Sequence, residues 1–180
     1  LSSRAQLVLA GVDQVAAEDT RTSARLFEQL GLRTPLTAVH DHNEAHRVPG
    51  LIARLQAGET LALVSDAGTP LISDPGYRLI AAAHDAGVTV VPVPGPCAAI
   101  TALSAAGLAS DRFHFEGFLP SRQGPRVARL KQLVEATPTL ILYEAPHRIV
   151  ETLEDLVATF GEERLATLAR ELTKTFETIR

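Results

Sequence analysis

The sequence lacks several features that would assign it to a specialised class of protein. It has one cysteine, Cys97, which rules out a disulfide framework and a cysteine-based zinc cluster and agrees with a reducing cytoplasm. No apolar run approaches the ~20 residues that a membrane-spanning helix needs, and no secretory signal pattern opens the chain. The Gly-rich phosphate loops of dinucleotide-binding and P-loop proteins are missing, so a nucleoside ligand without a pyrophosphate fits better. We therefore expect a cytoplasmic protein with no membrane partner.

What remains is the composition of an ordinary globular protein. The 180 residues are 46% hydrophobic, which is enough to bury one good core or two small ones. The net charge of −4 gives no overall positive field, so any contact with RNA has to come from a local basic patch. The sequence has no methionine, and Leu1 falls inside a helical pattern, so we expect both termini to be cuts in a longer chain.

Apolar runs rich in Val, Ile and Leu alternate with segments of helical period along the whole chain. This alternation is typical of βα units with a mostly parallel sheet. Gly31, Gly58 and Gly87 mark predicted helix ends, and Asp19 or Thr20 marks a helix start. The predicted strands are 12–17, 36–40, 60–65, 88–92, 113–117, 138–143 and 163–169.

The segment 107–126 breaks this rhythm with turn residues, aromatic residues and two prolines. We place a domain boundary at its start. The prediction is an N-terminal α/β domain, residues 1–109, with a parallel sheet flanked by helices. A second, mixed α/β domain follows in residues 110–180 and is short of full size.

The stretch VSDAGTPLISDPGY, residues 64–77, holds more polar and turn residues than a strand-to-helix connection requires. It follows a predicted strand, and ligands of open α/β sheets bind at the carboxyl ends of strands. Gly68 can adopt a positive φ and let a ligand approach the backbone, while Asp66 offers a carboxylate to hydroxyl or ammonium donors. Helix-start chemistry alone explains the second half, with Ser73 or Asp74 as the N-cap and Pro75 at the first helical position.

A second candidate loop is VVPVPGPCAAITALSAAG, residues 90–107. Prolines bracket Gly95, and small residues then open a helix, which leaves backbone amides near Cys97 and Ala98 available to a ligand. Close packing of a small-residue helix on the sheet explains the segment equally well.

The stretch HDHNEAH places His40, His42 and His46 beside Asp41 and Glu44, which resembles a metal site. His42 and His46 could share one helix face. The spacing matches no established zinc pattern, however, and polar loops that enter helices often have this composition, so we favour the metal-free interpretation. These histidines could still accept a proton or position a hydroxyl group.

The stretch SRQGPRVARLK, residues 121–131, is the only clearly basic one. Arginine forks suit phosphate oxygens, so this is where an RNA backbone would bind; a solvated helix face is the alternative. The candidate RNA-binding residues are Arg122, Arg126, Arg129 and Lys131.

Two further predicted strands end in polar residues. YEAPHRI carries Tyr143 and Glu144 at a strand end and starts a helix at Pro146, and LARELTKTFET carries Glu171 after another strand. Structural caps and an ion pair would explain either one alone. Both together, beside the first two loops, favour a site.

Seven motifs follow one another over nearly the whole chain: AAEDTR, HDHNE, LVSDAGTPLISDPGY, VPVPGPCAAITALSAAGL, FEGFLP, YEAPHR and ARELTKTFET. In this order they resemble the small-subunit ribosomal RNA methyltransferases, within the tetrapyrrole methylase superfamily of S-adenosylmethionine-dependent enzymes. The superfamily pattern is looser, and HDHNE and SDAGTP point to the RNA-modifying branch.

The resemblance implies a class III methyltransferase fold of two α/β domains with the methyl donor in the cleft between them, and a homodimer. The implied reaction transfers a methyl group to the ribose 2′-hydroxyl of a decoding-region cytidine, in free 16S rRNA or in the assembled small ribosomal subunit. The implied donor-binding residues are Ser65, Asp66, Ala67, Gly68, Thr69, Pro94, Gly95, Cys97, Ala98, Tyr143, Glu144, Ala145 and Glu171.

The implied chemistry asks mainly for positioning, with a base to take the hydroxyl proton and with no metal. His42, Asp66 and Glu116 are the candidates for that base or for positioning. The family's first strand and its last strands do not occur in this sequence, so we expect both domains and the donor pocket to be incomplete in it.

Two alternatives stay open. The first is a C-methyltransferase of the same superfamily that acts on a tetrapyrrole, which would have a deep apolar cleft and no use for the basic stretch. The second is a non-catalytic fragment that binds the donor or RNA.

Overall fold

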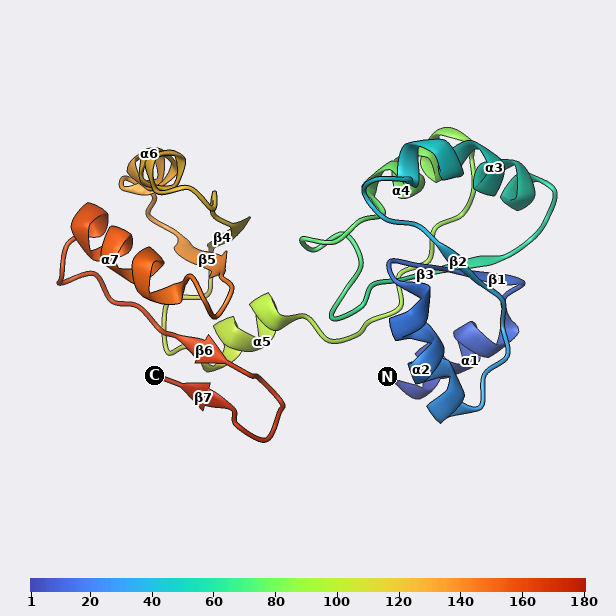
Figure 1. Ribbon diagram of the computed structural model, residues 1–180, viewed down its shortest axis with the longest axis horizontal. Helices are drawn as coiled ribbons and strands as arrows, with labels where there is room; N and C mark the ends of the chain where they lie inside the picture. The colour runs from blue at the N-terminus through green and yellow to red at the C-terminus, as the bar shows by residue number, and fades with distance from the viewer. The chain divides into compact units, whose positions relative to one another are not determined.

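In the computed structural model, which describes residues 1–180, the chain divides into two units, Leu1–Cys97 and Ala98–Arg180 (Figure 1). The elements of the first unit are α1 (Ser3–Gly11), β1 (Gln14–Ala17), α2 (Thr20–Leu30), β2 (Leu36–Ala38), α3 (Glu44–Gln56), β3 (Leu61–Val64) and α4 (Tyr77–Asp85). Those of the second unit are α5 (Ala98–Ala105), β4 (Phe113–Phe118), α6 (Gln123–Leu133), β5 (Thr139–Tyr143), α7 (Ile149–Phe160), β6 (Ala169–Arg170) and β7 (Thr178–Ile179).

The first unit is built on a parallel sheet with strand order β2-β1-β3. The central strand β1 is fully buried at Val15, Ala16 and Ala17. Because β1 pairs with β2 on one side and with β3 on the other, the loops that leave β1 and β3 lie next to each other at the carboxyl edge of the sheet.

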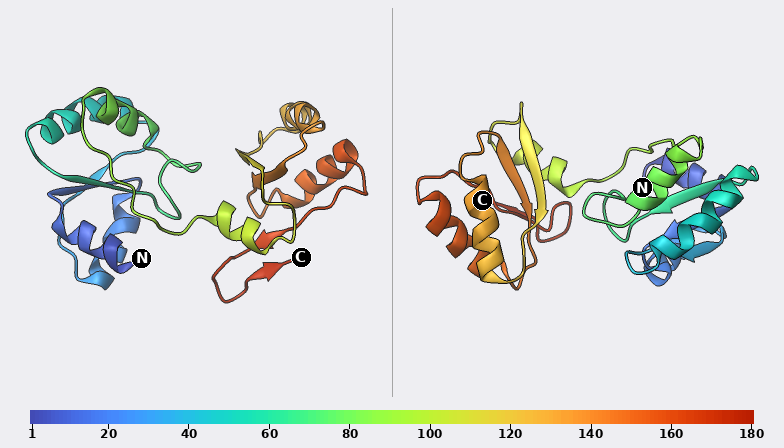
Figure 2. Two further views of the ribbon diagram at one scale, coloured as in Figure 1. Left: turned by 180° about the vertical axis from the view of Figure 1, so that it is seen from behind. Right: turned by 90° about the horizontal axis from the view of Figure 1, so that it is seen from above.

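Alternation along the strands gives the first unit two cores. Val15 packs with Leu9 of α1 and Phe27 of α2, whereas Ala16 packs with Leu51 of α3 and Leu79 of α4. Helices α1 and α2 therefore cover one face and α3 and α4 the other, as Figures 1 and 2 show. This confirms the predicted parallel sheet flanked by helices.

Helix boundaries in the first unit agree with the sequence in one case and differ in another. Asp19 caps α2 by accepting a hydrogen bond from Arg21 N–H at 2.8 Å, and Gly31 ends it in the left-handed conformation, as predicted. Helix α4 begins at Tyr77 with Gly76 as its N-cap, so the prediction of a start at Pro75 capped by Ser73 or Asp74 was wrong. Ser73 instead has a φ of 63°, which belongs to a turn.

The second unit combines a parallel pair, β4-β5, with an antiparallel hairpin, β6-β7. Helix α5 lies on one side of the parallel pair, and α6 and α7 lie on the other (Figures 1 and 2). Leu130 and Leu133 of α6 and Ile141 of β5 are buried in this unit. The mixed α/β character predicted for the C-terminal part is confirmed.

Two predicted strands and one predicted helix start differ from the structure. Residues 88–92 form no strand; Pro92 removes one ladder donor from this segment, and Pro94 and Pro96 remove two more directly after it. The strand predicted at 163–169 is reduced to β6 and starts at Ala169. Helix α7 begins at Ile149, after a turn that includes Pro146.

Helix α5 belongs to the second unit, because most of its contacts are with that unit, chiefly with β5. The domain division predicted from the sequence places α5 in the first domain. None of the helices has both the length and the apolar content required to cross a membrane.

Candidate functional site

Two polar loops are tied together at the carboxyl edge of the first sheet. The loop after β1 carries Glu18 and Asp19, and the loop after β3 carries Asp66. Asp19 N–H donates to Asp66 Oδ1 at 3.1 Å, and Asp66 N–H lies 3.4 Å from Glu18 Oε2. The AAEDTR and SDAGTP motifs, which are 47 residues apart, therefore form one structural feature.

Acidic side chains converge at this edge. Burial raises the pKa of Glu18, and repulsion from Asp74, Asp66 and Asp41 adds to the increase. Burial also raises the pKa of Asp74, again with repulsion from Asp66 and Asp41, although a hydrogen bond from Ser65 opposes it. Such a concentration of negative charge is complementary to a cationic ligand.

The two loops predicted to bind a donor meet in the first unit. Thr69 Oγ1 donates to the Pro96 carbonyl at 2.8 Å, which joins the segment after β3 to the proline-rich segment before α5. Gly68 has a φ of +85°, as predicted, and a Cβ placed on it would lie 3.9 Å from the same Pro96 oxygen. The structure therefore brings Ser65, Ala67, Gly68 and Thr69 together with the segment that contains Pro94, Gly95 and Cys97.

Strain is concentrated in the loop that follows. Leu71 and Ser73, neither of them glycine, have φ values of 72° and 63°, and Gly76 has a φ of 124°. In Leu71 and Ser73 this left-handed conformation costs free energy, and it persists where the surrounding structure imposes it, commonly at binding sites.

Candidate donor residues of the second unit make hydrogen bonds within that unit. Tyr143 ends β5, and its hydroxyl accepts a hydrogen bond from Ala99 N–H at 3.1 Å, one residue after Ala98 opens α5. Ala145 N–H donates to the Glu144 carboxylate at 2.7 Å. Tyr143 thus acts as a cap for the first turn of α5, a role that the sequence did not indicate.

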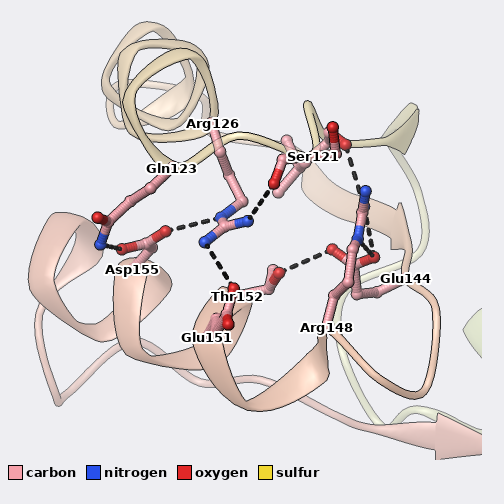
Figure 3. A network of polar contacts seen from close by, with 9 residues as sticks. Ser121, Gln123, Arg126, Glu144, Arg148, Glu151, Thr152 and Asp155 are labelled. Carbon is pink, nitrogen blue, oxygen red and sulfur yellow. Dashed lines mark hydrogen bonds and ion pairs between the residues drawn. The ribbon is translucent and has the colours of Figure 1, made fainter.

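Glu144 is fully engaged by its own unit, as Figure 3 shows. Besides Ala145 N–H, it accepts hydrogen bonds from Arg148 Nε at 2.6 Å and Thr152 Oγ1 at 2.7 Å. Burial acts to raise the pKa of Glu144, but the hydrogen bonds from Thr152, Ala145 and Arg148 outweigh it and lower that pKa. We therefore assign the Glu144 side chain to structure rather than to direct contact with the donor.

The basic stretch divides into two buried or paired arginines and two exposed cations. Arg126 is 1% exposed and donates from Nε to Asp155 at 2.7 Å (Figure 3). Arg129 donates to Glu116 at 2.5 Å and 2.7 Å. Arg126 is therefore closed to a phosphate backbone, because it is buried and paired with a carboxylate, whereas the paired Arg129 keeps a side chain that is 38% exposed. Arg122 and Lys131 are exposed.

The candidates for the proton acceptor come from both units, His42 and Asp66 from the first and Glu116 from the second. Glu116, in the second unit, accepts hydrogen bonds from Arg129 and His114, which lower its pKa, and we do not carry it forward as a base. His42 is exposed in a turn that Asn43 closes by accepting a hydrogen bond from His40 N–H at 2.9 Å, and Asp66 lies in the acidic cluster.

Glu171 lies in the turn between β6 and β7 with a φ of 51°. No group of three or more His, Cys, Asp or Glu side chains has an arrangement that could hold a metal ion. Sequence reasoning missed Glu18, Asp19 and Asp74 as members of the site. The signal for Glu18 and Asp19 was the position of AAEDTR directly after an apolar run, the same position that Asp66 has.

This arrangement of loops at the carboxyl edge of a parallel sheet, in two α/β units, matches one family along the whole chain. The family model for Tetrapyrrole (Corrin/Porphyrin) Methylases covers residues 1–180, and the chain belongs to this family.

Among solved structures, the methyltransferase CobJ resembles the chain with a TM-score of 0.67 at 19% identity, over 100% of this chain and 79% of that one. Uroporphyrin-III-C-methyltransferase from Thermus thermophilus gives a TM-score of 0.62 at 23% identity, over 100% and 77%. These similarities confirm the two-part α/β methyltransferase fold predicted from the sequence.

Curated relatives are much closer in sequence. The Ribosomal RNA small subunit methyltransferase I of Pseudomonas aeruginosa is 60% identical over 180 residues, which are 100% of this chain and 64% of that protein. The protein of the same name from Escherichia coli O157:H7 is 56% identical over 179 residues, which are 99% and 63%. The chain therefore spans somewhat less than two thirds of the length of these relatives.

Proposed function

We propose that this chain carries the donor-binding part of an S-adenosylmethionine-dependent methyltransferase that modifies small-subunit ribosomal RNA. The proposed acceptor is the ribose 2′-hydroxyl of a cytidine in the decoding region of 16S rRNA, presented by the free RNA or by the assembled small subunit. A homodimer, a cytoplasmic location and independence of metal ions are parts of the same proposal.

One observation carries the proposal. Identity of 51–60% extends along nearly the entire chain to proteins named for small-subunit ribosomal RNA methylation. The solved tetrapyrrole-related enzymes share the fold at only 15–23% identity. Because one fold hosts many reactions, that lower similarity speaks for the architecture alone and does not favour a tetrapyrrole substrate.

The residues at the carboxyl edge of the first sheet suit this donor. S-adenosylmethionine carries a sulfonium and an ammonium group, and the cluster around Asp66, Glu18 and Asp74 is complementary to both charges. Gly68 has a positive φ and no side chain, so a ligand can approach its backbone closely. In the second unit, Ala98, Tyr143, Ala145 and Glu171 stay proposed donor residues because their motifs match.

The reaction asks the protein mainly for alignment. When bound, the donor supplies an electrophilic methyl carbon: its bond to sulfur breaks as the bond to the ribose oxygen forms, and the hydroxyl proton leaves to a base. Holding the oxygen in line with that carbon can lower the barrier by roughly 7–11 kcal/mol. His42 and Asp66 are the proposed groups for positioning the hydroxyl or taking its proton.

The experiment that tests donor binding is a calorimetric titration of S-adenosylmethionine into the full-length protein and into Asp66→Ala. Loss of one charged hydrogen-bonding group should weaken donor binding by roughly 10- to 150-fold. Asp85→Ala is the matched control, because Asp85 is exposed at the far end of α4. Methyl transfer to small ribosomal subunits that lack the modification then tests the acceptor.

Unchanged donor affinity in Asp66→Ala, with the fold intact, would remove Asp66 from the proposed site. Donor binding without any transfer to small subunits would leave a donor-binding protein with a different acceptor, and the proposed substrate would be wrong.

A further inference from the structure

An exposed aromatic ring is held in a fixed position in the second unit. Phe118, the last residue of β4, is 56% exposed. Its ring packs edge to face against Tyr143, with centroids 5.5 Å apart, and Tyr143 packs in the same way on Phe115 at 5.0 Å. Burying a phenylalanine normally stabilises a protein by about 1.5–3 kcal/mol, and more than half of this ring stays available to a partner.

A bulge in β4 brings this ring to its place. The register between β4 and β5 shifts between Phe115 and Gly117, and Gly117 has a φ of 71°. In a regular strand Phe115 and Phe118 would point to opposite faces, yet both contact the Tyr143 ring. The extra residue therefore re-aims Phe118, as bulges beside functional sites often do.

The turn after Phe118 is fixed from inside by two arginines. Arg148 Nη2 donates to the Leu119 carbonyl at 3.1 Å, and Arg126 Nη1 donates to the Ser121 carbonyl at 3.2 Å. Leu119 is 3% exposed, and the arginines are held in turn by Glu144 and Asp155 (Figure 3). A charged network that ends on two carbonyls of the same turn makes the turn rigid.

Arg122 follows this turn directly. It is exposed at the start of α6, and none of the ion pairs of the neighbouring arginines includes it. The rigid turn thus presents an aromatic ring at its beginning and a guanidinium at its end, separated by three residues. We call this pair the Phe118–Arg122 surface.

We propose that the Phe118–Arg122 surface binds an unstacked nucleotide of the RNA substrate, with the base on the Phe118 ring and the phosphate at Arg122. The inference rests on the proposed function. Proteins recognise single-stranded RNA by stacking bases on aromatic rings and by pairing arginine with phosphates, and a preformed surface lowers the entropy lost on binding.

The test uses the full-length protein with unmodified small ribosomal subunits as acceptor and saturating S-adenosylmethionine. Phe118→Leu should raise KM for subunits by roughly 5- to 150-fold, because base stacking on an aromatic residue contributes that much to affinity. Donor affinity, measured by calorimetry, should not change. Phe118→Tyr should restore KM, and Phe113→Leu, which removes a 44% exposed ring at the opposite end of β4, should have no effect.

Salt dependence separates the two halves of the surface. Arg122→Gln should weaken subunit binding and reduce the slope of log affinity against log salt by roughly 0.7–1, which is the value for one lost phosphate contact. Phe118→Leu should leave that slope unchanged, because stacking releases no counterions.

The inference is overturned if Phe118→Leu has the wild-type KM, or if its donor affinity falls by the same factor as its subunit affinity, since the ring would then contact the donor. These results differ from failure of the proposed function. In that case the wild-type protein itself would transfer no methyl group to subunits, and both proposals would be wrong.

Discussion

The acidic residues at the carboxyl edge of the first sheet lower the stability of the fold, because they are partly buried and repel one another. Glu18 and Asp74 both have raised pKa values, caused first by burial and then by repulsion from neighbouring carboxylates. A native protein keeps such an arrangement where binding a cation offsets the repulsion, and this is the usual conflict between stability and function at a site.

The first prediction concerns Glu18→Gln. The amide keeps an oxygen for the Asp66 N–H and removes the charge, so the variant should be more stable than the wild type by about 0.5–1 kcal/mol at pH 7.5. Because the folded pKa of Glu18 is raised, the wild type loses its penalty as pH falls and the carboxyl protonates, so the gain should vanish near pH 4. Thermal unfolding at both pH values measures it.

Glu28→Gln, at an exposed position on α2, is the control for a change of net charge. Donor affinity of Glu18→Gln should fall at pH 7.5, in the direction opposite to stability. A variant that is destabilised to the same extent at both pH values would show that Glu18 acts through packing.

At the scale of single residues, the role of a residue could be predicted from the sequence where that role depends on local backbone conformation. Gly68 was recognised from its loop and has the positive φ that was expected. The roles of Arg126 and Glu144 could not be predicted, because a buried ion pair and a local carboxylate network depend on how α6, α7 and β5 pack. In sequence a buried arginine and a solvated one look the same.

Helix α4 shows how an element can take its cap from elsewhere. Its N-cap is Gly76, which has no side chain, and Glu44 of α3 instead accepts a hydrogen bond from Leu79 N–H at 3.0 Å. Glu44 is 4% exposed, so this contact is shielded from water. The HDHNE motif thereby supports the helix that follows the SDAGTP loop, a connection across 35 residues that sequence reasoning did not find.

Gly76 gives a prediction at the scale of the element. An alanine Cβ there would lie 2.6 Å from Leu63 Cδ2, at a φ of 124° that L-residues rarely adopt. Gly76→Ala should therefore lower the free energy of unfolding by roughly 2–4 kcal/mol. Gly87→Ala, with a φ of 69° and no atom within 4 Å, should cost only about 1 kcal/mol. Equal losses in urea unfolding would show that the contact with Leu63 relaxes.

Strands with partners were predicted better than those without. β1, β3 and β5 lie within their predicted ranges because each is an apolar run that pairs with a parallel neighbour. The apolar run at 88–92 forms no strand, although its composition resembles that of the runs that do. The strand was predicted there because composition does not show whether a neighbouring strand is placed to pair with it. Pairing is a tertiary property, so periodicity alone overestimates the strand content.

At the scale of the whole molecule the two units differ in the pKa shifts of their carboxyl groups, because the raised values occur in the first unit. In the first unit burial raises the pKa values of Glu18 and Asp74. In the second unit, hydrogen bonds lower pKa values instead. The bond from Arg129 lowers the pKa of Glu116, and those from Gln123 and then Arg126 lower the pKa of Asp155. The pKa of Glu144 is also lowered. The alternation of strands and helices predicted the α/β class of both units, but not this difference.

The last prediction is that acid destabilises the second unit more than the first. A carboxyl with a lowered folded pKa contributes stability that is complete above its unfolded pKa, about 4, and is lost as pH falls through the folded value. Glu116, Glu144 and Asp155 all act in this way. Glu18 and Asp74 act in the opposite direction, because the folded first unit takes up their protons more readily than the unfolded chain does.

Hydrogen exchange of the full-length protein at pH 6 and at pH 3, corrected for intrinsic rates, measures this for each unit. Protection in 113–160 should fall more than protection in 14–85. Asp13 and Asp19, in the first unit, have lowered pKa values, so acid also removes some stability there. The hydrogen bonds responsible, from Thr60 to Asp13 and from Arg21 to Asp19, face solvent and are screened, so this loss should be small. Equal loss in the two segments would mean that acid acts on the units together rather than through the carboxylates of each.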